Sequence, residues 1–581
     1  MTETAIKQLS NEEIQEQSGQ KLNYLGFPNI KRAGIKMAYS QEDISEWKKC
    51  RENCIYFIEK YSKIVSLDDG LVDFKMWDFQ KNMINMCLTE RELLFMLSRQ
   101  VGKTTVLACG YLLWKALFYP NQNILILANE GDLATEILYE KIYTALEEIP
   151  FFLQPGVRVL NKRKCIFDNG SRITAKASNP KAVGRGRSYN IVFIDEFAYV
   201  NNADMFYESV YPTLSSGKKT QIIIASTPNG MNMFHKLWHD AQRGRNTYKT
   251  YSVNWNSVPA RDEAWKKKEL ANLGPRKFAV VHECKFMGSE QTLLDSASLE
   301  TITFENPVET ITTALGDMVI YEKPIPGAVY VSVIDTAQGL GKDSSTDVVI
   351  KVSQPNKPAG QPAFTVVATF ENKDISPYTF PTVVNTLGKM YNNAHILIEL
   401  NDQGETVAHS LWEDFEYENL VWVDNTESKQ VPGTGNKYGV KTSPAVKRKG
   451  CQALKTIVEA KQLDIRSYEI LQQLAAFISK GNSYEAESGS HDDLVMPLVI
   501  FGWLTTFPFF TEISNANVKK ILYGEKLQDF QEETLPFIIV DNGKPSQPEV
   551  QYGGLPWYNS PNENTNQTNN SQNDTNFWLL G

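Results

Sequence analysis

The chain has 581 residues and a formal net charge of −9; 42% of its residues are hydrophobic and 22% are charged. This composition is typical of a globular protein, and the length suffices for about two to four domains. The negative charge argues against a static nucleic-acid coat, because such proteins are usually basic, although it leaves room for local basic grooves. The seven cysteines are scattered without a C-x-x-C pair, which argues against a zinc site and a disulfide scaffold.

The two ends of the chain differ from its middle. Residues 1–40 are predicted to form an N-terminal arm, and their polar start, MTETAIKQLSNEEIQEQ, predicts no signal peptide. Residues 40–61 have apolar side chains at helical spacing, with Ser40 as a candidate cap. Residues 542–581 are rich in Pro and Gly and then in Asn, so we expect a disordered tail.

Two series of apolar runs predict two α/β domains. In the first series, the runs 92–97, 123–128, 190–195 and 221–226 alternate with helical patterns such as 130–148 and 204–216, which is typical of a parallel sheet with helices on both faces. In the second, three successive strands at 328–335, 347–353 and 363–370 are followed by strands at 395–400 and 420–423 that alternate with helices, which favours a mixed sheet.

These patterns set the domain limits. Because 290–327 shows no strong periodicity, we place the first domain at 41–305, a linker at 306–320 and the second domain at 321–541. The most apolar stretch, 494–510, is short for a bilayer span and contains Pro497, so it predicts a buried core helix and no membrane anchor.

A phosphate-binding loop follows the first strand. Gly102-Lys103-Thr104 matches the end of G-x-x-x-x-G-K-[ST], but Leu97 stands where the first glycine would fall. The tripeptide alone is a weak signal, and its context between an apolar strand and an apolar helix strengthens it. Lys103 would reach the β- and γ-phosphates of a nucleotide, and Thr104 would hold Mg²⁺.

Other residues complete a nucleotide site. The strand IVFIDE ends in Asp195, placed to hold Mg²⁺, and Glu196, placed to polarise an attacking water. The strand QIIIAS ends in STPNG, where Ser226, Thr227 and Asn229 could sense the γ-phosphate. Upstream, the aromatic ring of Phe79 and the amide of Gln80 suit adenine. Together and in this order, these residues predict an ATPase.

Three arginines near this site leave alternatives open. Arg99 lies inside the loop and is either a solvated side chain or a cis arginine finger that neutralises the transferring phosphoryl group. Arg185 and Arg187 precede the acid strand and face either DNA or the nucleotide; the sequence does not decide between them.

The second domain has separated carboxylates at strand ends and at a helix start. Asp335 ends VYVSVID, Glu399 ends HILIE, and Asp492 and Asp493 begin the helix of SHDDLVMPLVIFGWL. Converging carboxylates can bind two divalent cations and so promote phosphodiester hydrolysis. Asp343, after a glycine loop, could add a ligand, with Asp347 as its rival. The alternative is that these are ordinary surface acids, since the chain has 68 Asp and Glu.

A basic run lies near these acids in sequence. NKYGVKTSPAVKRKGCQALK, residues 436–455, could track DNA phosphates or could be a solvated helix face. Its basic residues are Lys437, Lys441, Lys447, Arg448, Lys449 and Lys455.

The chain resembles the large terminase subunit of tailed bacteriophages, the DNA-packaging motor protein, and most closely the contractile-tail myophage type. The resemblance covers about 24–541 and is carried by YLGFPNIKRAGIK, SEWKKCRENCIYF, LSRQVGKTT, IDEFAYV, STPNG, IELNDQG and HDDLVMPLVIFGWL. It implies an N-terminal RecA-like (ASCE P-loop) ATPase domain and a C-terminal RNase H-like α/β nuclease domain. It also implies a deviant loop, S-R-Q-x-G-K-T, in which Ser98 replaces the first glycine.

The resemblance further assigns the site residues. The nucleotide would be bound by Phe79, Gln80, Ser98, Arg99, Gln100, Gly102, Lys103, Thr104, Thr105, Asp195, Ser226 and Thr227. Arg99 would act as the cis finger, Glu196 as the base, and Ser226-Thr227 would couple hydrolysis to domain movement. The nuclease would use Asp335, Glu399 and one of Asp492 and Asp493, with Asp493 favoured. The glycine loop before Asp343 differs in length from the family's pattern, so Asp343 is a candidate from its position alone.

The same resemblance implies a cellular role. The cofactors would be ATP and Mg²⁺, with Mn²⁺ as an alternative in the nuclease. The partners would be double-stranded DNA, the portal protein, the small terminase subunit and further copies in a ring, a pentamer by family, in the host cytoplasm and transiently at the procapsid portal vertex. The alternatives are a helicase-nuclease of DNA repair or restriction, and a non-enzymatic assembly scaffold.

Overall fold

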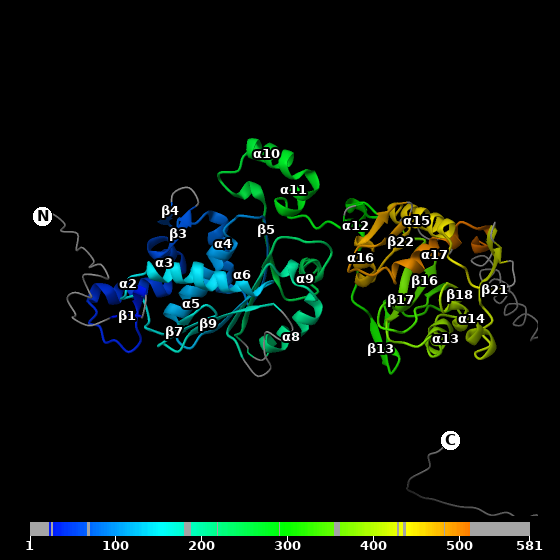
Figure 1. Ribbon diagram of the computed structural model, residues 1–581, viewed down its shortest axis with the longest axis horizontal. Helices are drawn as coiled ribbons and strands as arrows, with labels where there is room; N and C mark the ends of the chain where they lie inside the picture. The colour runs from blue at the N-terminus through cyan, green and yellow to red at the C-terminus, as the bar shows by residue number, and fades with distance from the viewer. Residues whose placement is uncertain are drawn as a thin grey trace, which may run out of the picture. The chain divides into compact units, whose positions relative to one another are not determined.

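The computed structural model describes part of the chain (Figure 1). The described residues are 22–24, 27–66, 70–178, 188–215, 217, 219–289, 291–353, 361–426, 429–433, 437–481 and 483–511. The predicted disordered tail at 542–581, the first 21 residues of the arm, and Arg185 and Arg187 lie outside them.

The N-terminal region forms small elements that precede the first sheet. These are β1 (Asn23–Tyr24), β2 (Phe27–Lys31), α2 (Gln41–Glu52), α3 (Cys54–Tyr61), β3 (Lys63–Ser66), β4 (Gly70–Asp73) and α4 (Asp78–Thr89). Ser40 caps α2 in a capping box with Asp43. The helical pattern over 40–61 is two helices, because Asn53 adopts an extended conformation and its side chain caps α3 at Tyr56 N.

The first sheet has eight strands. Their order is β12 (Lys249–Val253), β5 (Glu92–Leu97), β11 (Gln221–Ser226), β10 (Ile191–Asp195), β6 (Asn123–Ala128), β9 (Arg172–Ala177), β8 (Lys164–Phe167) and β7 (Val157–Asn161). The strands from β12 to β9 are parallel, and β8 and β7 continue the sheet antiparallel. Strand β11 therefore separates β5 from β10, and the carboxyl ends of all three meet at one edge.

Helices cover both faces of this sheet, as predicted. Along β5, Leu93 and Phe95 pack into one core with η1 and α4, whereas Leu94 and Met96 pack into another with α8 and α9. This two-sided burial explains why the strands are continuous apolar runs. The helices are η1 (Thr105–Leu112), α5 (Leu113–Phe118), α6 (Gly131–Glu136), η2 (Ile137–Ile142), α7 (Tyr143–Glu147), η3 (Phe197–Tyr199), α8 (Ala203–Ser215), α9 (Met233–Gln242), η4 (Trp255–Ser257), α10 (Glu263–Leu273) and α11 (Pro275–Val281).

The second sheet is mixed, as predicted. Its order is β13 (Glu309–Thr313), β14 (Gly316–Ile320), β17 (Phe364–Asn372), β16 (Ser345–Val352), β15 (Val329–Asp335) and β18 (His395–Ile398), and β22 (Leu463–Asp464) pairs with β17. Strands β15, β16 and β17 are antiparallel, and β18 pairs with β15 in parallel. Residues 306–320, predicted as a linker, contain β13 and β14, so this segment completes the sheet edge; the domain limits stay a prediction.

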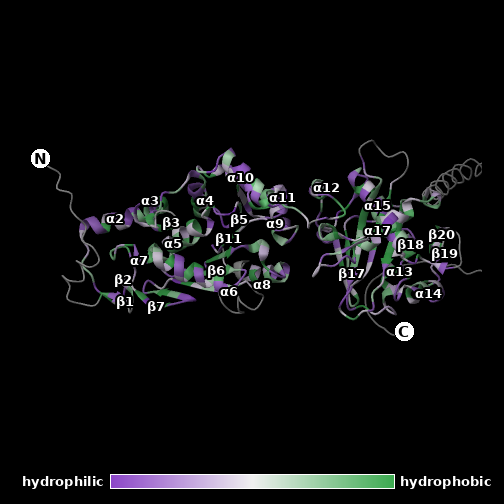
Figure 2. Ribbon diagram, turned by 45° about the horizontal axis from the view of Figure 1, so that its top comes forward, coloured by the Kyte–Doolittle hydropathy of each residue, from purple (hydrophilic) through white to green (hydrophobic). Residues whose placement is uncertain are grey.

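Helices and small sheets surround the second sheet. They are α12 (Ser296–Thr301), α13 (Phe380–Met390), α14 (Gly404–Glu413), α15 (Pro444–Glu459), α16 (Tyr468–Ala475), α17 (Val495–Thr505), β19 (Trp422–Thr426), β20 (Lys429–Pro432), β21 (Lys437–Tyr438), β23 (Phe477–Lys480) and β24 (Ser483–Ala486). Figure 2 shows hydrophobic residues gathered along central strands such as β17, whereas α2 is largely hydrophilic.

Helix α17 is the core helix that the apolar stretch 494–510 predicts. Its residues from Val495 to Leu504 are all buried. None of the helices in the described ranges is both long enough and apolar enough to cross a membrane.

A carboxyl group is buried in the second sheet, on the face that packs against α13 and α14. Asp347 is fully buried in β16; Ser332 Oγ donates to its Oδ1 at 2.6 Å, and its Oδ2 has no hydrogen-bond partner among the described residues. Burial raises the pKa of Asp347 from 3.8 to about 7, and the hydrogen bond from Ser332 opposes this rise. The folded chain therefore retains a proton between about pH 4 and pH 7 that the unfolded chain releases, so this group lowers stability as the pH rises.

We predict that Asp347→Asn removes this pH dependence. As the pH rises from 5 to 8, the free energy of unfolding of the variant should increase relative to that of the wild type by about 2–3 kcal/mol. Urea unfolding at several pH values measures the difference, and the exposed Asp317→Asn is the matched control. A constant difference between variant and wild type across this range would contradict the prediction.

Candidate active sites

The loop after β5 lies at the edge where β5, β11 and β10 end. Ser98 N donates to Val253 O at 2.9 Å, and Arg99 N donates to Val281 O at 2.9 Å, so the start of the loop is fixed by segments far away in sequence. Gln100 and Gly102 have φ angles of 58° and 72°, the left-handed region that glycine tolerates best. The loop then enters the helix of η1, whose N-terminus can receive phosphate.

Lys103 forms the electrostatic centre of this edge. Its Nζ lies 2.6 Å from Glu196 Oε1 and 3.3 Å from Asp195 Oδ1. Burial disfavours the ammonium charge, but the two carboxylates outweigh this effect and raise the pKa of Lys103. Thr104 Oγ1 donates to Asp195 Oδ2 at 2.6 Å. The structure thus brings the predicted loop residues and the predicted acid pair together.

Glu196 occupies a strained position beside the end of β11. Its φ angle is 52°, which is unusual for a glutamate, and its backbone N donates to Asp195 Oδ1 at 3.0 Å. Its Oε2 lies 3.5 Å from both Ser226 Oγ and Thr227 N, while Asn229 donates to Ala198 O at 3.2 Å. The STPNG segment is therefore in contact with the acid pair.

Gln80 is bound to the loop itself. It is 3% exposed, its Nε2 donates to Val101 O at 3.0 Å and its Oε1 accepts from Trp77 N at 3.0 Å. A Cβ on Gly102 would meet this Nε2 at 3.0 Å, so glycine suits the close approach. Phe79 is buried in the core beside Trp77. Contact of these two residues with adenine stays a prediction.

Two residues that the sequence reasoning missed hold the loop from outside. Arg261 donates to Ser98 Oγ at 3.2 Å, to Arg99 O at 3.0 Å and to Gln100 O at 3.2 Å, and its guanidinium lies 4.6 Å from the Trp265 ring centre. His282 Nδ1 lies 3.3 Å from Ser98 Oγ, and burial together with Arg261 lowers the pKa of this imidazole. No local motif indicates these roles, because both residues act over more than 160 positions. The side chain of Arg99 is exposed, so its role as a finger stays a prediction.

The predicted acids of the second domain line one cavity of about 460 Å³. The six acids in its wall are Asp335, Asp343, Glu399, Asp402, Asp492 and Asp493, and Lys342 and Lys447 are its two lysines. Five of these acids, all except Asp402, are predicted from the sequence; they come from the ends of β15 and β18, the loop before β16 and the residues just before α17. Carboxylate oxygens form the donor set that hard divalent cations prefer.

Asp335 and Glu399 interact directly in this cavity. Burial raises the pKa of Asp335 well above its ordinary value, and the negative charges of Glu399, Asp493 and Asp492 raise it further. Burial also raises the pKa of Glu399, and the carboxyl groups of Asp335 and Glu399 share a hydrogen bond. Gly404 allows α14 to start against Glu399, because a Cβ there would lie 1.7 Å from Glu399 O.

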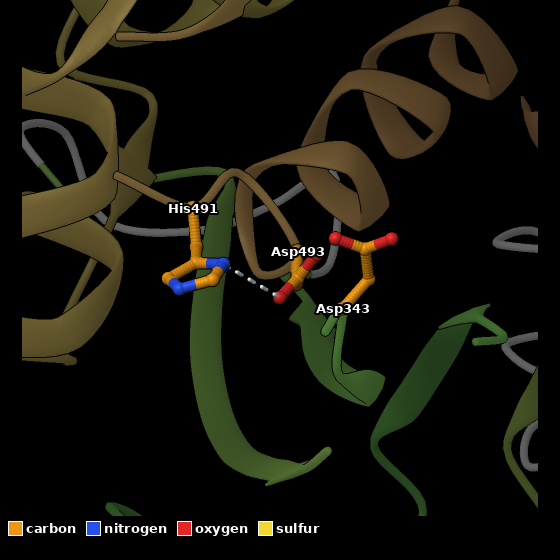
Figure 3. A group of neighbouring side chains, drawn as sticks. All are labelled: Asp343, His491 and Asp493. Carbon is orange, nitrogen blue, oxygen red and sulfur yellow. Dashed lines mark ion pairs between the residues drawn. The ribbon is translucent and has the colours of Figure 1, made fainter. Parts of the chain in front are cut away.

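Asp493 is held at the start of α17. Ser344 N donates to its Oδ2 at 2.9 Å, and Thr346 Oγ1 donates to its backbone O at 2.8 Å. Figure 3 shows Asp493 with Asp343 and His491, and one ligand atom from each lies within 4.8 Å of the others. His491 Nδ1 is 3.8 Å from Asp493 Oδ2. The glycine loop therefore brings Asp343 to the acids.

Asp347 belongs to the opposite face. It pairs with Ile334, which packs into the core with α13 and α14, whereas Asp335 is one residue further along β15 and so points the other way. Of the two rivals for an additional ligand, the structure favours Asp343.

The described lysines of the basic run have different surroundings, and a phosphate-tracking groove stays a prediction. Lys437 pairs with Glu405, Lys455 pairs with Glu459, and Lys449 lies 4.0 Å from the centre of the Phe507 ring. Within the run, Lys447 lines the acid cavity.

Comparison with known families identifies both domains. Residues 94–301 match the family model "Terminase large subunit, T4likevirus-type, N-terminal", and residues 333–499 match "Terminase RNaseH-like domain". The chain belongs to the large terminase subunit family. This terminase accordingly has a P-loop ATPase domain and an RNase H-like nuclease domain, as the sequence predicts. The predicted myophage type is consistent with the T4-like family model. The helicase-nuclease alternative is not supported.

Solved structures of other terminases are similar at low identity. The HK97 bacteriophage large terminase is 12% identical, with 78% of this chain and 99% of that chain covered and a TM-score of 0.42. A large terminase from a thermophilic bacteriophage, solved in complex with ADP, is 10% identical, with 73% and 98% covered and a TM-score of 0.33. The large terminase nuclease of the thermophilic phage G20c with bound cobalt is 16% identical, with 37% and 97% covered and a TM-score of 0.28.

We predict that Arg261 tightens nucleotide binding by this terminase. Arg261→Gln removes charged hydrogen bonds to the loop, each typically worth about 1.5–3 kcal/mol, so the KM for ATP should rise by about tenfold or more. Steady-state ATP turnover measures this, and Lys267→Gln, on the exposed side of α10, is the matched control. A KM within twofold of the wild type would show that Arg261 does not hold the loop.

Proposed function

We propose that this terminase hydrolyses ATP at residues 98–105 to drive double-stranded DNA into a procapsid, and that Asp335, Glu399 and Asp493 cut the DNA concatemer. One observation carries the proposal: each sheet ends in a cluster of acids, and only the first cluster includes a lysine from a phosphate-binding loop. The two activities would therefore use separate sites.

In the ATPase domain, the ion pairs of Lys103 support a switch in its partners. Its ammonium, now bound to Asp195 and Glu196, would turn to the β- and γ-phosphates when ATP enters. This exchange would free Glu196 to accept a proton from the attacking water. Thr104 and Asp195 offer hard oxygen ligands that fit Mg²⁺, which when bound neutralises charge on the phosphate oxygens. Arg99, exposed at the loop, would add positive charge to the transferring group.

The contact between Glu196 and the end of β11 supports a coupling role for STPNG. When the γ-phosphate leaves, Glu196 can change its position, and Ser226 and Thr227 lie 3.5 Å from its carboxylate. Such a shift would favour one of two positions of the domain that holds the DNA.

In the nuclease domain, the crowded carboxylates support divalent metal binding. Asp335, Glu399 and Asp493, with Asp492 or Asp343, fit Mg²⁺ or Mn²⁺, which when bound stabilises the attacking and leaving oxygens of a phosphodiester. The chain's own residues would orient this set: Asn401 Nδ2 donates to Glu399 Oε1 at 3.1 Å, and Ser344 holds Asp493.

The family also suggests where the protein works. We infer that it binds the portal protein and the small terminase subunit, and that several copies form a ring, a pentamer by family, at the portal vertex of the procapsid in the host cytoplasm. The C-terminal FWLLG, which we interpret as a docking peptide, lies outside the described residues.

We predict that Glu196→Gln binds ATP but fails to hydrolyse it. Loss of a general base lowers turnover by about 10²- to 10⁴-fold, whereas the loop contacts of the nucleotide remain. Turnover in the presence of DNA and the affinity for a fluorescent ATP analogue measure the two effects, with the exposed Glu208→Gln as control. Turnover within threefold of the wild type would contradict the assignment of Glu196 as the base.

A further inference from the structure

Lys447 is the lysine of the basic run that reaches the acid cavity. It lies in the first turns of α15 and is half-buried, while its neighbours Arg448 and Lys449 are exposed. It shares the cavity wall with Asp335, Glu399 and the aspartate pair. This position separates it from the remainder of the run.

A close helix crossing fixes this lysine in place. A Cβ on Gly450 would lie 2.3 Å from Val499 O, and a Cβ on Gly502 would lie 2.8 Å from Gly450 O, so α15 and α17 touch backbone to backbone. Lys447 is three residues before Gly450 and on the same side of α15, and Met496, three residues before Val499, also lines the cavity. Lys447 therefore lies opposite the start of α17.

The ammonium of Lys447 forms no ion pair with the described acids around it. No carboxylate of the described residues lies within ion-pair distance of its Nζ, which lies 5.6 Å from the centre of the Phe477 ring. Its charge is nonetheless close enough to favour ionisation of Glu399 and Asp492. A cation held rigidly beside a metal-binding acid cluster, without a paired carboxylate, suits an anion that enters from outside.

We propose that the Lys447 ammonium binds the phosphate group at the bond that the nuclease cuts. Its point charge suits a phosphate oxygen, and its fixed position on α15 would align the DNA strand with Asp335 and Glu399. Lys342, the other lysine of the cavity, lies on an exposed loop and lacks this fixed position. The inference rests on the proposed nuclease site.

Plasmid cutting by the full chain at saturating Mn²⁺ or Mg²⁺ tests the proposal. Lys447→Met keeps the aliphatic stem against Phe477 but removes the charge, and it should lower the cutting rate at least tenfold, whereas Lys447→Arg should retain most of it and ATP turnover should not change. The matched control is Lys389→Gln, on the exposed side of α13. Cutting by Lys447→Met at the wild-type rate would overturn the proposal. Recovery of the variant to that rate at a metal concentration above the one that saturates the wild type would also overturn it, because the lysine would then only balance the acids.

A second measurement uses the wild type, so it does not depend on variant folding. Plasmid DNA bound in Ca²⁺ should protect Lys447 from acetylation by at least fivefold while Lys389 stays reactive; equal reactivity of Lys447 with and without DNA would overturn the proposal. Asp335→Asn separates the two ideas. If Asp335→Asn still cuts, the proposed nuclease site fails; if it does not cut and Lys447→Met cuts normally, only the role of Lys447 fails.

Discussion

Carboxylates crowded at the end of a sheet repel one another unless a cation lies among them, and this constraint governs both domains. In the first domain, Asp195 and Glu196 follow a buried strand, and Lys103 arrives from the next strand but one to neutralise them. In the second, Asp335 and Glu399 lie on paired strands without such a lysine in contact, and both pKa values are raised. The same electrostatic problem is thus solved once within the chain and once by proposed metal ions.

The two solutions suit two kinds of chemistry. A lysine on a phosphate-binding loop can exchange its acids for a nucleotide, so the ATPase site can alternate between two arrangements. A cluster of carboxylates on a rigid sheet can hold metal in one geometry, which is what phosphodiester cleavage requires. The rigidity has visible causes: Gly404 lets α14 approach Glu399, and the Gly450–Gly502 crossing fixes α15, which carries Lys447, against α17, which begins just after Asp493.

Much of the architecture could be predicted because the strands are buried on both faces. The runs 92–97, 123–128 and 221–226 match β5, β6 and β11 residue for residue. Two features with little burial behind them were not predicted. Strand β13 is largely exposed, and the break at Asn53 is a local cap within a continuous helical pattern. The residues that end strands were predictable for the same reason as the strands themselves.

Site residues that act over long sequence distances could not be predicted. Arg261 reaches the loop from a segment that has no phosphate motif, and Lys447 differs from Lys449 only in the side of α15 that it occupies. The sequence could not decide between Asp343 and Asp347 as an additional ligand. The choice depends on the path of the glycine loop before β16 and on the face of the sheet to which Asp347 belongs.

We infer that this terminase carries two separable sites on one chain. ATP turnover and plasmid cutting, measured in parallel for the wild type, Lys103→Ala and Asp335→Asn, test it most directly. We expect that Lys103→Ala loses ATP turnover and still cuts, and that Asp335→Asn loses cutting and still hydrolyses ATP. Cutting by Asp335→Asn at the wild-type rate would contradict the assignment of the second acid cluster as a nuclease.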